Sequence, residues 1–202
     1  VGRRPNVEGL DLQMAGVPLD ARGQPVLDAH ALRAGSSPVF LAGDASAIRP
    51  LMHEAVDEGL IAARAAAQFL GGRPHGDLPP RRTPLAIVFS DPDIATVGQA
   101  YDTLDLDRTV IGSAEGAANG RSRVMGAEGN LVRIYADRGN GRLLGAGLLA
   151  ARGEHLAHLL AWAVQRGETV ESLLAMPYYH PSIEEMVQSA LKDASRQLAA
   201  SK

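Results

Sequence analysis

Over the first 70 positions, apolar residues occur in short runs and one long segment, separated by turn signals, as in a mixed α/β unit. The short apolar run at 39–42 is typical of a strand that is buried on both faces of a parallel sheet. An alanine-rich segment follows at 51–70, with Pro50 before it and Gly71 after it. Proline near the start and glycine past the end are usual helix boundaries, so we predict a strand and then a long helix.

The segment 71–84 is dense in glycine and proline and is the best linker candidate in the chain. Beyond it the pattern changes to short apolar runs that are separated by turns. These runs predict five strands, at 85–89, 95–97, 122–125, 131–136 and 142–149. The turns at 126–130 and 138–141 are short enough for neighbouring strands to pair, so we expect an antiparallel meander.

Two segments in the C-terminal part carry apolar residues at the spacing i, i+3, i+4, i+7 of an amphipathic helix. The first spans 156–164 and the second spans 183–198. Strands in a meander followed by helices are typical of an α+β domain. We therefore expect an α/β unit over residues 1–80, followed by an α+β unit over residues 81–202 that combines an antiparallel sheet with helices.

The composition is that of an ordinary globular protein, with 202 residues, 46% hydrophobic and 21% charged, and a net charge of -3. No run of lysine or arginine is long enough to form a footprint for a phosphate backbone, so we expect no nucleic-acid partner. No apolar stretch reaches the roughly 20 residues that span a bilayer, so we expect no membrane partner.

Cysteine is absent from the chain. Its absence agrees with a reduced, cytoplasmic location, and it means that no thiol chemistry can originate in these residues. The chain begins at Val1 and runs straight into Gly2-Arg3-Arg4-Pro5-Asn6, whereas a natural start is more often polar and irregular. We therefore expect the chain to be a piece of a larger protein.

Gly43 and Asp44 directly follow the predicted strand at 39–42, and the predicted helix begins a few residues later. Ligands of α/β proteins bind at the carboxyl ends of strands, where glycine allows a close approach to the backbone and a carboxylate can accept hydrogen bonds from hydroxyl groups. The same two residues also form an ordinary turn after a strand. From the residues alone, both interpretations stay open.

His180 and Glu185 stand just before and at the start of the second amphipathic helix. An imidazole titrates near neutral pH and can carry protons, and a carboxylate on its other nitrogen fixes the tautomer and raises the basicity. The spacing also fits a second role, because Ser182-x-x-Glu185 matches a capping box at a helix start. A structural, partly buried His180 fits the spacing equally well.

Two further patterns resemble binding sites and are better explained as structure. Gly145-Ala146-Gly147-Leu148-Leu149-Ala150 fits a dinucleotide fingerprint, yet no strand ending in Asp or Glu follows about 20 residues later, as that fingerprint requires. His155 and His158, with Glu154 beside them, lie on one helical turn without a further ligand. We therefore predict surface or interface residues there and no metal site.

Four segments, in order along the chain, resemble the pyridine nucleotide-disulfide oxidoreductases, and among them the dihydrolipoamide dehydrogenases most of all. The segments are Gly2–Leu10, Val39–Gly59, Phe89–Gly98 and His180–Glu185. The resemblance implies that residues 1–80 are the C-terminal segment of an FAD-binding domain, with the exit from the NAD domain at its start. It implies that residues 81–202 are a dimerisation (interface) domain, through which a homodimer forms.

The resemblance also assigns roles to single residues. The positions that match FAD contacts of the family are Gly43, Asp44, Leu51, Met52 and His53. Of these, Asp44 matches the residue that binds the ribityl chain, and the backbone of the last three matches the helix start that faces the flavin ring. The position that matches the catalytic acid/base is His180, and Glu185 matches the carboxylate that orients it.

The implied reaction of the whole protein is oxidation of dihydrolipoamide, through a cysteine pair and FAD, with NAD as the acceptor. The dithiol would be carried by a lipoyl-bearing protein or be a small molecule. We expect the chain alone to be inactive and not to retain FAD, since the cysteine pair and the pyrophosphate-binding unit are not in it. The alternatives are a glutathione reductase-like enzyme and a free-standing dimerisation module without catalysis. Tyr178 and Tyr179 replace the small or histidine residues common in the family, and Ser182 replaces its threonine, which leaves the disulfide substrate open.

Overall fold

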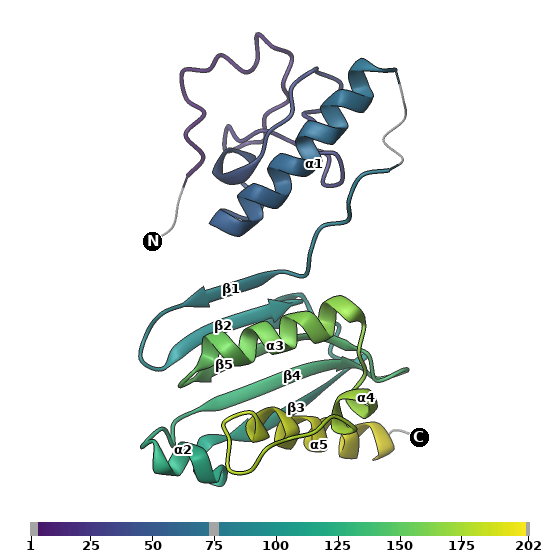
Figure 1. Cartoon of the computed structure of the whole chain (residues 1–202). Coiled ribbons are helices and arrows are strands. Elements are labelled where there is room, and N and C mark those ends of the chain that lie inside the picture. Colours follow the sequence, from purple (N-terminus) through teal and green to yellow (C-terminus); the bar gives the residue numbers. More distant parts are fainter. Residues whose placement is uncertain (1–3, 73–76, 201–202) are drawn as a thin grey trace. The chain divides into compact units, whose positions relative to one another are not determined.

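The computed structural model describes residues 4–72 and 77–200 and divides the chain into two compact units, Val1–Arg82 and Thr83–Lys202 (Figure 1). The division falls inside the glycine- and proline-rich segment at 71–84. Part of that segment, 73–76, and the first residues of the Gly2–Leu10 match lie outside the described residues. Each unit has its own hydrophobic core.

The first unit is built around the helix α1, Met52–Leu70, which confirms the predicted long helix. Its inner face carries Ile61 and Ala65, which pack with the fully buried Leu32 of the preceding loops. Single antiparallel bridges join parts of these loops, at Leu19–Pro25, Leu27–Ala34 and Arg33–Phe40. A 3-10 turn, η1, Gly43–Ser46, precedes α1.

The apolar run at 39–42 does not form the parallel strand that its composition predicts. Phe40 makes one antiparallel bridge with Arg33, and no ladder extends from it. A strand needs a neighbour that satisfies its backbone N–H and C=O groups, and the described part of the first unit holds no strand that could serve as one. Phe40 instead packs against Phe69 of α1, with 6.0 Å between the ring centroids. The turn η1 therefore follows an extended loop rather than a strand.

The second unit contains a five-stranded sheet in which each pair of neighbours is antiparallel. The strands are β1 (Leu85–Val88), β2 (Asp93–Gly98), β3 (Thr109–Glu115), β4 (Leu131–Asp137) and β5 (Leu143–Ala150). Their order across the sheet is β1-β2-β5-β4-β3, so β5 returns to pair with β2. The antiparallel sheet predicted for this part of the chain is confirmed.

Two helices, α3 (Gly153–Arg166) and α5 (Glu185–Ala200), lie on the same face of the sheet (Figure 1). The helix α3 contacts β1, β2 and β5, whereas α5 contacts β3 and β4. Alternate strand residues, such as Val97, Ile134 and Leu148, point toward the two helices and form the buried core between the sheet and the helices. Shorter elements complete the unit, namely η2 (Tyr101–Thr103), η3 (Gly116–Ala118), α2 (Gly120–Val124) and α4 (Val170–Leu174). The predicted α+β architecture is therefore confirmed.

Two details of the second unit differ from the expectation. Residues 122–125, predicted as a strand, lie at the end of the short helix α2, because the Asn119 side chain caps this helix by accepting the N–H of Ser122 at 2.8 Å. The sequence pattern does not predict β3, whose apolar residues are interrupted by Gly112. A glycine is required there because a Cβ would collide with the carbonyl oxygen of Ala190 in α5.

Candidate functional site

His180 and Glu185, which the spacing pairs, are in direct contact. His180 lies in the loop between α4 and α5, and Glu185 is the first residue of α5. The Nδ1 atom of His180 is 3.0 Å from Oε1 and 3.1 Å from Oε2 of Glu185. The side chain of His180 is 79% exposed, whereas that of Glu185 is 23% exposed. Within the described residues, Nε2 of His180 has no hydrogen-bond partner, so it is available to a substrate.

Glu185 also holds the start of α5. Its Oε2 accepts the N–H of Ser182 at 3.0 Å, which is one half of a capping box. The other half is missing, because the Ser182 hydroxyl is buried and has no hydrogen-bond partner among the described residues. One carboxylate therefore both caps the helix and contacts the imidazole, so the geometry is compatible with both interpretations that its spacing left open.

The pKa of Glu185 is lowered from its ordinary value. The largest cause is the N–H of Ser182, and the hydrogen bond with His180 comes second; both favour the ionised carboxylate. An ionised Glu185 accepts the Nδ1–H of the imidazole and so selects the tautomer in which Nε2 carries the lone pair. This arrangement suits proton transfer at Nε2.

A buried polar network supports the loop that carries His180. The side-chain amide of Asn119 donates to the carbonyl oxygen of Ser182 at 3.1 Å, while its oxygen caps α2. The hydroxyl of Ser122 donates to the sulfur of Met186 in α5 at 3.4 Å. Sequence reasoning missed this network. An asparagine before a short helix is a typical N-cap and could have been recognised, but its contact with Ser182 joins positions 63 apart and leaves no local signal.

The two tyrosines before His180 have different surroundings. Tyr178 is half-buried against the core of the second unit, and its hydroxyl donates to the carbonyl oxygen of Leu173 at 3.2 Å. Burial raises the pKa of Tyr178 above its ordinary value. Tyr179 is 83% exposed. Of this pair, Tyr179 is therefore the side chain that can meet a substrate beside His180.

The residues expected to contact FAD lie in η1 and at the start of α1. Gly43 opens η1 with a φ of 67°, a backbone conformation that favours glycine. A Cβ at this position would come within 3.1 Å of the Cβ of Ala55 in α1. Asp44 follows on the exposed surface. Gly43 therefore lets the turn pack closely against the helix. This close packing does not depend on a ligand.

The N-terminal end of α1 is open to a ligand. Leu51 is the N-cap residue, and no side chain caps the helix there. The first N–H groups of a helix, here those of Met52 and His53, have no acceptor within the helix and lie at the positive end of its dipole. Together with the carboxylate of Asp44, they fit one side of a ligand that has a negatively polarised ring and a chain of hydroxyl groups, as FAD has. The residues present thus fit part of a flavin site.

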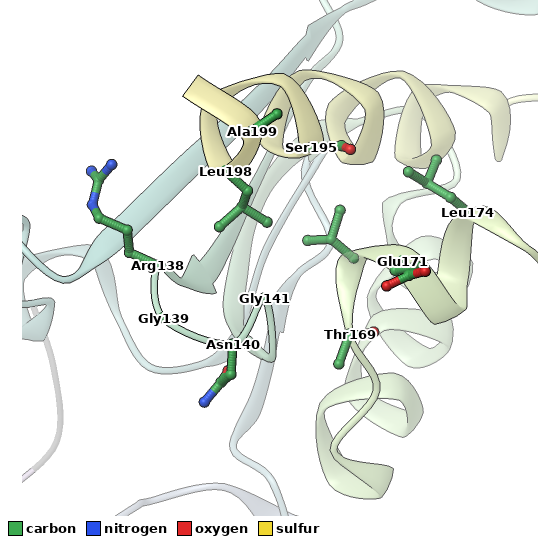
Figure 2. Close-up of a pocket in the computed structure, with 11 residues that line it drawn as sticks. Arg138, Gly139, Asn140, Gly141, Thr169, Glu171, Leu174, Ser195, Leu198 and Ala199 are labelled. Carbon is green, nitrogen blue, oxygen red and sulfur yellow. The ribbon is translucent and has the colours of Figure 1, made fainter. Parts of the chain in front are cut away.

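A cavity of about 550 Å³ lies at the opposite end of α5 from Glu185 (Figure 2). Its walls come from the β4–β5 turn, α4 and the last turns of α5. The guanidinium group of Arg138 is held by two backbone carbonyl oxygens at 3.1 Å each, so this side chain has a structural role. Ser195, another lining residue, lies roughly ten residues along the helix from Glu185, or about 15 Å at the usual rise. The cavity is therefore separate from the His180 site.

The remaining binding-like patterns have structural explanations. The stretch 145–150 is part of β5, where a Cβ on Gly147 would approach the Tyr135 hydroxyl to 2.7 Å. On α3, His155 lies 3.3 Å from the carboxylate of Glu154. Within residues 4–72 and 77–200, no group of three or more His, Cys, Asp or Glu side chains is placed to hold a metal ion. In the same ranges, no helix combines the length and the apolar character needed to cross a bilayer.

A protein-family model matches residues 85–191, from β1 into α5. Its description is the dimerisation domain of the pyridine nucleotide-disulphide oxidoreductases. The match covers more than half of the chain and includes the whole sheet, α3 and the His180–Glu185 pair.

Two curated relatives illustrate the similarity in sequence. Dihydrolipoyl dehydrogenase 2 of Haloarcula marismortui is 32% identical over 192 residues, which are 94% of this chain and 39% of that protein. The mitochondrial dihydrolipoyl dehydrogenase of Bos taurus is 27% identical over 197 residues, which are 96% of this chain and 37% of that protein. The chain thus spans about two fifths of the length of these relatives.

Solved structures show the same correspondence. LpdA from Mycobacterium tuberculosis superimposes with a TM-score of 0.73 at 26% identity, and the match covers 98% of this chain and 41% of that one. The flavoprotein disulfide reductase RclA from Escherichia coli, in its Cu(II) complex, also gives a TM-score of 0.73 and covers 95% of this chain. At 21% identity, this second likeness shows a shared fold alone.

Proposed function

Because this chain belongs to the pyridine nucleotide-disulphide oxidoreductase family, through its dimerisation domain, we propose that it is the C-terminal part of an FAD- and NAD-dependent dihydrolipoamide dehydrogenase. The two sequence relatives described above support this choice, since both are dihydrolipoyl dehydrogenases that match nearly the whole chain. The observation that carries the proposal is the contact between His180 and Glu185. It supplies the proton acceptor that oxidation of a dithiol needs.

In the proposed mechanism, His180 removes a proton from the dithiol, which then attacks a disulfide. Glu185 accepts the Nδ1–H, which leaves the lone pair on Nε2. Nε2 takes the proton of one substrate thiol, and the resulting thiolate is the nucleophile that attacks a disulfide. The ionised Glu185 stabilises the imidazolium until its proton is released. This chain has no cysteine, so the disulfide under attack has to come from a redox-active cysteine pair elsewhere in the protein.

We assign residues 1–80 to the C-terminal segment of the FAD-binding domain. Asp44 would hold the ribityl chain by accepting hydrogen bonds from its hydroxyl groups, and the N–H groups of Met52 and His53 would be the contacts to the flavin ring. The chemistry that a bound FAD would supply is two-electron transfer between the cysteine pair and NAD+. Gly43 keeps the turn close to α1, so both groups of contacts can act on one ligand.

We further propose that His180 serves the active site of the partner subunit in a homodimer. The ring is largely exposed and lies beside the exposed Tyr179, so its own unit does not enclose it. A second copy can bring the cysteine pair and the flavin to this ring. Exposed large apolar side chains on the same unit, among them Phe89 and Trp162, are surfaces that a partner would cover.

Two alternatives differ from this proposal in what they predict for the full-length protein. A glutathione reductase-like enzyme would turn over a small peptide disulfide in preference to lipoamide. A dimerisation module without catalysis would form dimers, and replacing His180 would change no reaction. Steady-state assays with lipoamide and with glutathione disulfide separate the three.

Replacing His180 with glutamine in the full-length protein tests the proposed role. We expect oxidation of dihydrolipoamide to slow by about 10²–10⁴-fold, because a positioned general base is lost. FAD content and the mass of the dimer should stay at the wild-type level. His158→Gln is the matched control, because this exposed histidine of α3 makes a hydrogen bond with the carbonyl oxygen of Glu154 and a ring contact with Trp162, both away from His180 in the sequence. It should retain wild-type turnover.

Wild-type turnover in His180→Gln would refute the catalytic role. The placement in the partner's site has its own test, a mixed dimer of one His180→Gln subunit and one subunit that lacks the redox cysteines. Such a dimer retains one complete site if His180 acts on the partner. A mixed dimer with no recovered activity would contradict that arrangement.

A further inference from the structure

Two buried carboxylates lie one turn apart on α1. Glu54 is 3% exposed, and Glu58 is fully buried. Ionised side chains are found buried in this way when they are paired and hydrogen-bonded, because an isolated charge loses its hydration without compensation. Neither side chain takes part in the proton transfer or in the flavin contacts proposed above, so their burial needs a reason of its own.

Glu58 holds the turn η1 against the helix. Its Oε2 accepts the backbone N–H of Gly43 at 2.8 Å and the hydroxyl of Ser46 at 2.9 Å. The hydroxyl of Ser46 in turn accepts the N–H of Ile48 at 3.2 Å, on the loop that leads into α1. One carboxylate on α1 therefore fixes both ends of the turn that contains Asp44.

Two arginines balance the two carboxylates. Arg81 forms an ion pair with Oε1 of Glu58 and lies 3.6 Å from Glu54, and Arg49 lies 3.1 Å from Glu54. The Nε atom of Arg81 is buried without a hydrogen-bond partner among the described residues. The side chain of Arg81 is partly buried, 18% exposed, and the two carboxylates balance its charge. Loss of Arg81 would remove the counter-charge of the buried Glu58, whereas loss of Glu58 would leave Arg81 with only the longer 3.6 Å contact to Glu54 among the described residues.

We propose that Glu58 and Arg81 are positioning residues for the flavin, and that their ion pair sets where the Gly43–Ser46 turn stands relative to the N-terminal end of α1. This inference rests on the proposed function, which assigns Asp44 in the turn and the first N–H groups of α1 to FAD. The carboxylate of Asp44 and the first N–H groups of α1 can contact one ligand only if the distance between the turn and the helix is maintained. The pair maintains that spacing from inside, on the side of the helix that a ligand does not touch.

The test uses the full-length protein and compares buried with exposed ion pairs of the same helix. Glu58→Gln and Arg81→Met each break the buried pair, and Arg81→Lys keeps its charge. Asp57→Asn is the matched control, because Asp57 pairs at 3.4 Å with Arg82, whose side chain is 76% exposed. Ser46→Ala removes one hydroxyl donor and no charge, so it probes the same contact if Glu58→Gln does not fold. The measurements are the dissociation constant and the midpoint potential of FAD.

We expect Glu58→Gln and Arg81→Met to raise the FAD dissociation constant by at least about tenfold, the loss of one hydrogen bond to a charged group. The midpoint potential should become more negative, since a displaced helix end stabilises the reduced, anionic flavin less. Arg81→Lys should lie between Arg81→Met and wild type in both the dissociation constant and the midpoint potential. Ser46→Ala should change both quantities in the same direction as Glu58→Gln, but by less. Asp57→Asn should match wild type.

A purely structural role would lower the unfolding temperature and leave the midpoint potential of the bound flavin unchanged, and that result would overturn the inference. Wild-type affinity and potential in Glu58→Gln would overturn it as well, with the proposed function intact. A wild-type full-length protein that binds no FAD at all would overturn the proposed function together with this inference.

Discussion

The carboxylate of Glu185 accepts hydrogen bonds from the backbone of Ser182 and from the ring of His180. Both donors favour the ionised form, so the folded-state pKa lies below the ordinary value of 4.5. The ionised carboxylate therefore stabilises the folded protein at pH values above 4.5. This contribution is lost as the pH falls through the lowered folded-state pKa.

Glu185→Gln should accordingly reduce stability in a pH-dependent way. At pH 7 we expect a loss of about 1 kcal/mol in the free energy of unfolding, the usual net value of such a hydrogen bond. The loss should shrink as the pH drops below 4.5, because the wild-type carboxylate then takes up a proton. Urea unfolding of the wild type and of Glu185→Gln from pH 7 down to pH 3 measures this difference in the free energy of unfolding. Glu184→Gln is the neighbouring control. A difference that does not vary with pH would contradict the assigned cause.

Residue contacts could be predicted where the partners lie close together in sequence. The His180–Glu185 contact follows from a five-residue spacing and a helix start, and the structure contains it. The contacts of Asn119 and Glu58 join positions 63 and 15 apart, and no local pattern indicates them. Burial of Glu58 is unexpected from sequence for a further reason, since a glutamate on a helix is normally solvent-exposed.

The packing of α5 on the sheet depends on one backbone approach. Gly112 of β3 lies directly under the helix, where a Cβ would collide with the carbonyl oxygen of Ala190 and lie 2.8 Å from the Cβ of Ala194. Ala190 and Ala194 are fully buried. Small residues on both elements let the helix lie close to the strand.

Gly112→Ala should therefore force the helix and the strand apart. We expect a destabilisation of about 1–3 kcal/mol, which is typical of an overpacked core. Gly129→Ala is the control, since a Cβ there has no neighbour within 4 Å, and it should change stability by less than about 0.5 kcal/mol. Thermal or denaturant unfolding of the two variants decides the matter. Equal stabilities would mean that the close approach is not a constraint.

Elements with a clear period were predictable, and elements defined by one contact were not. The periods at 156–164 and 183–198 predicted α3 and α5, and the structure confirms both helices. The strand predicted at 122–125 is wrong because an asparagine cap starts a helix there. The strand β3 was not predicted because Gly112 interrupts its pattern, and the reason for that glycine lies in a helix about 80 residues further on.

At the scale of the whole molecule, the chain forms two units, each with its own core. The change of pattern around 71–84 indicated a boundary from sequence alone. The pairing of β2 with β5 was not predictable in the same way, because these strands lie about 50 residues apart and no local sequence pattern indicates that they pair. In the first unit, the run at 39–42 remains a loop with one antiparallel bridge, at Phe40, because no strand among the described residues of this unit pairs with it.

The second unit should associate even without the rest of a full-length protein. We expect the purified chain to form a homodimer at micromolar concentration, because the family model that it matches is a dimerisation domain and because large apolar side chains such as Phe89 and Trp162 are exposed. Obligate interfaces of this kind bury on the order of 2,000 Å² or more. Light scattering should give twice the mass of one chain. A stable monomer at that concentration would disagree with the proposed assembly.

The carboxylate of Glu185 makes the state of this site measurable without an enzymatic reaction. The backbone N–H of Ser182 is held by the oxygen that also contacts the ring of His180. An amide held in this way exchanges its hydrogen with deuterium in the solvent only when the contact opens. The exchange rate of this single amide therefore records how readily Glu185 releases the backbone of Ser182, in protein that has neither cofactor nor substrate.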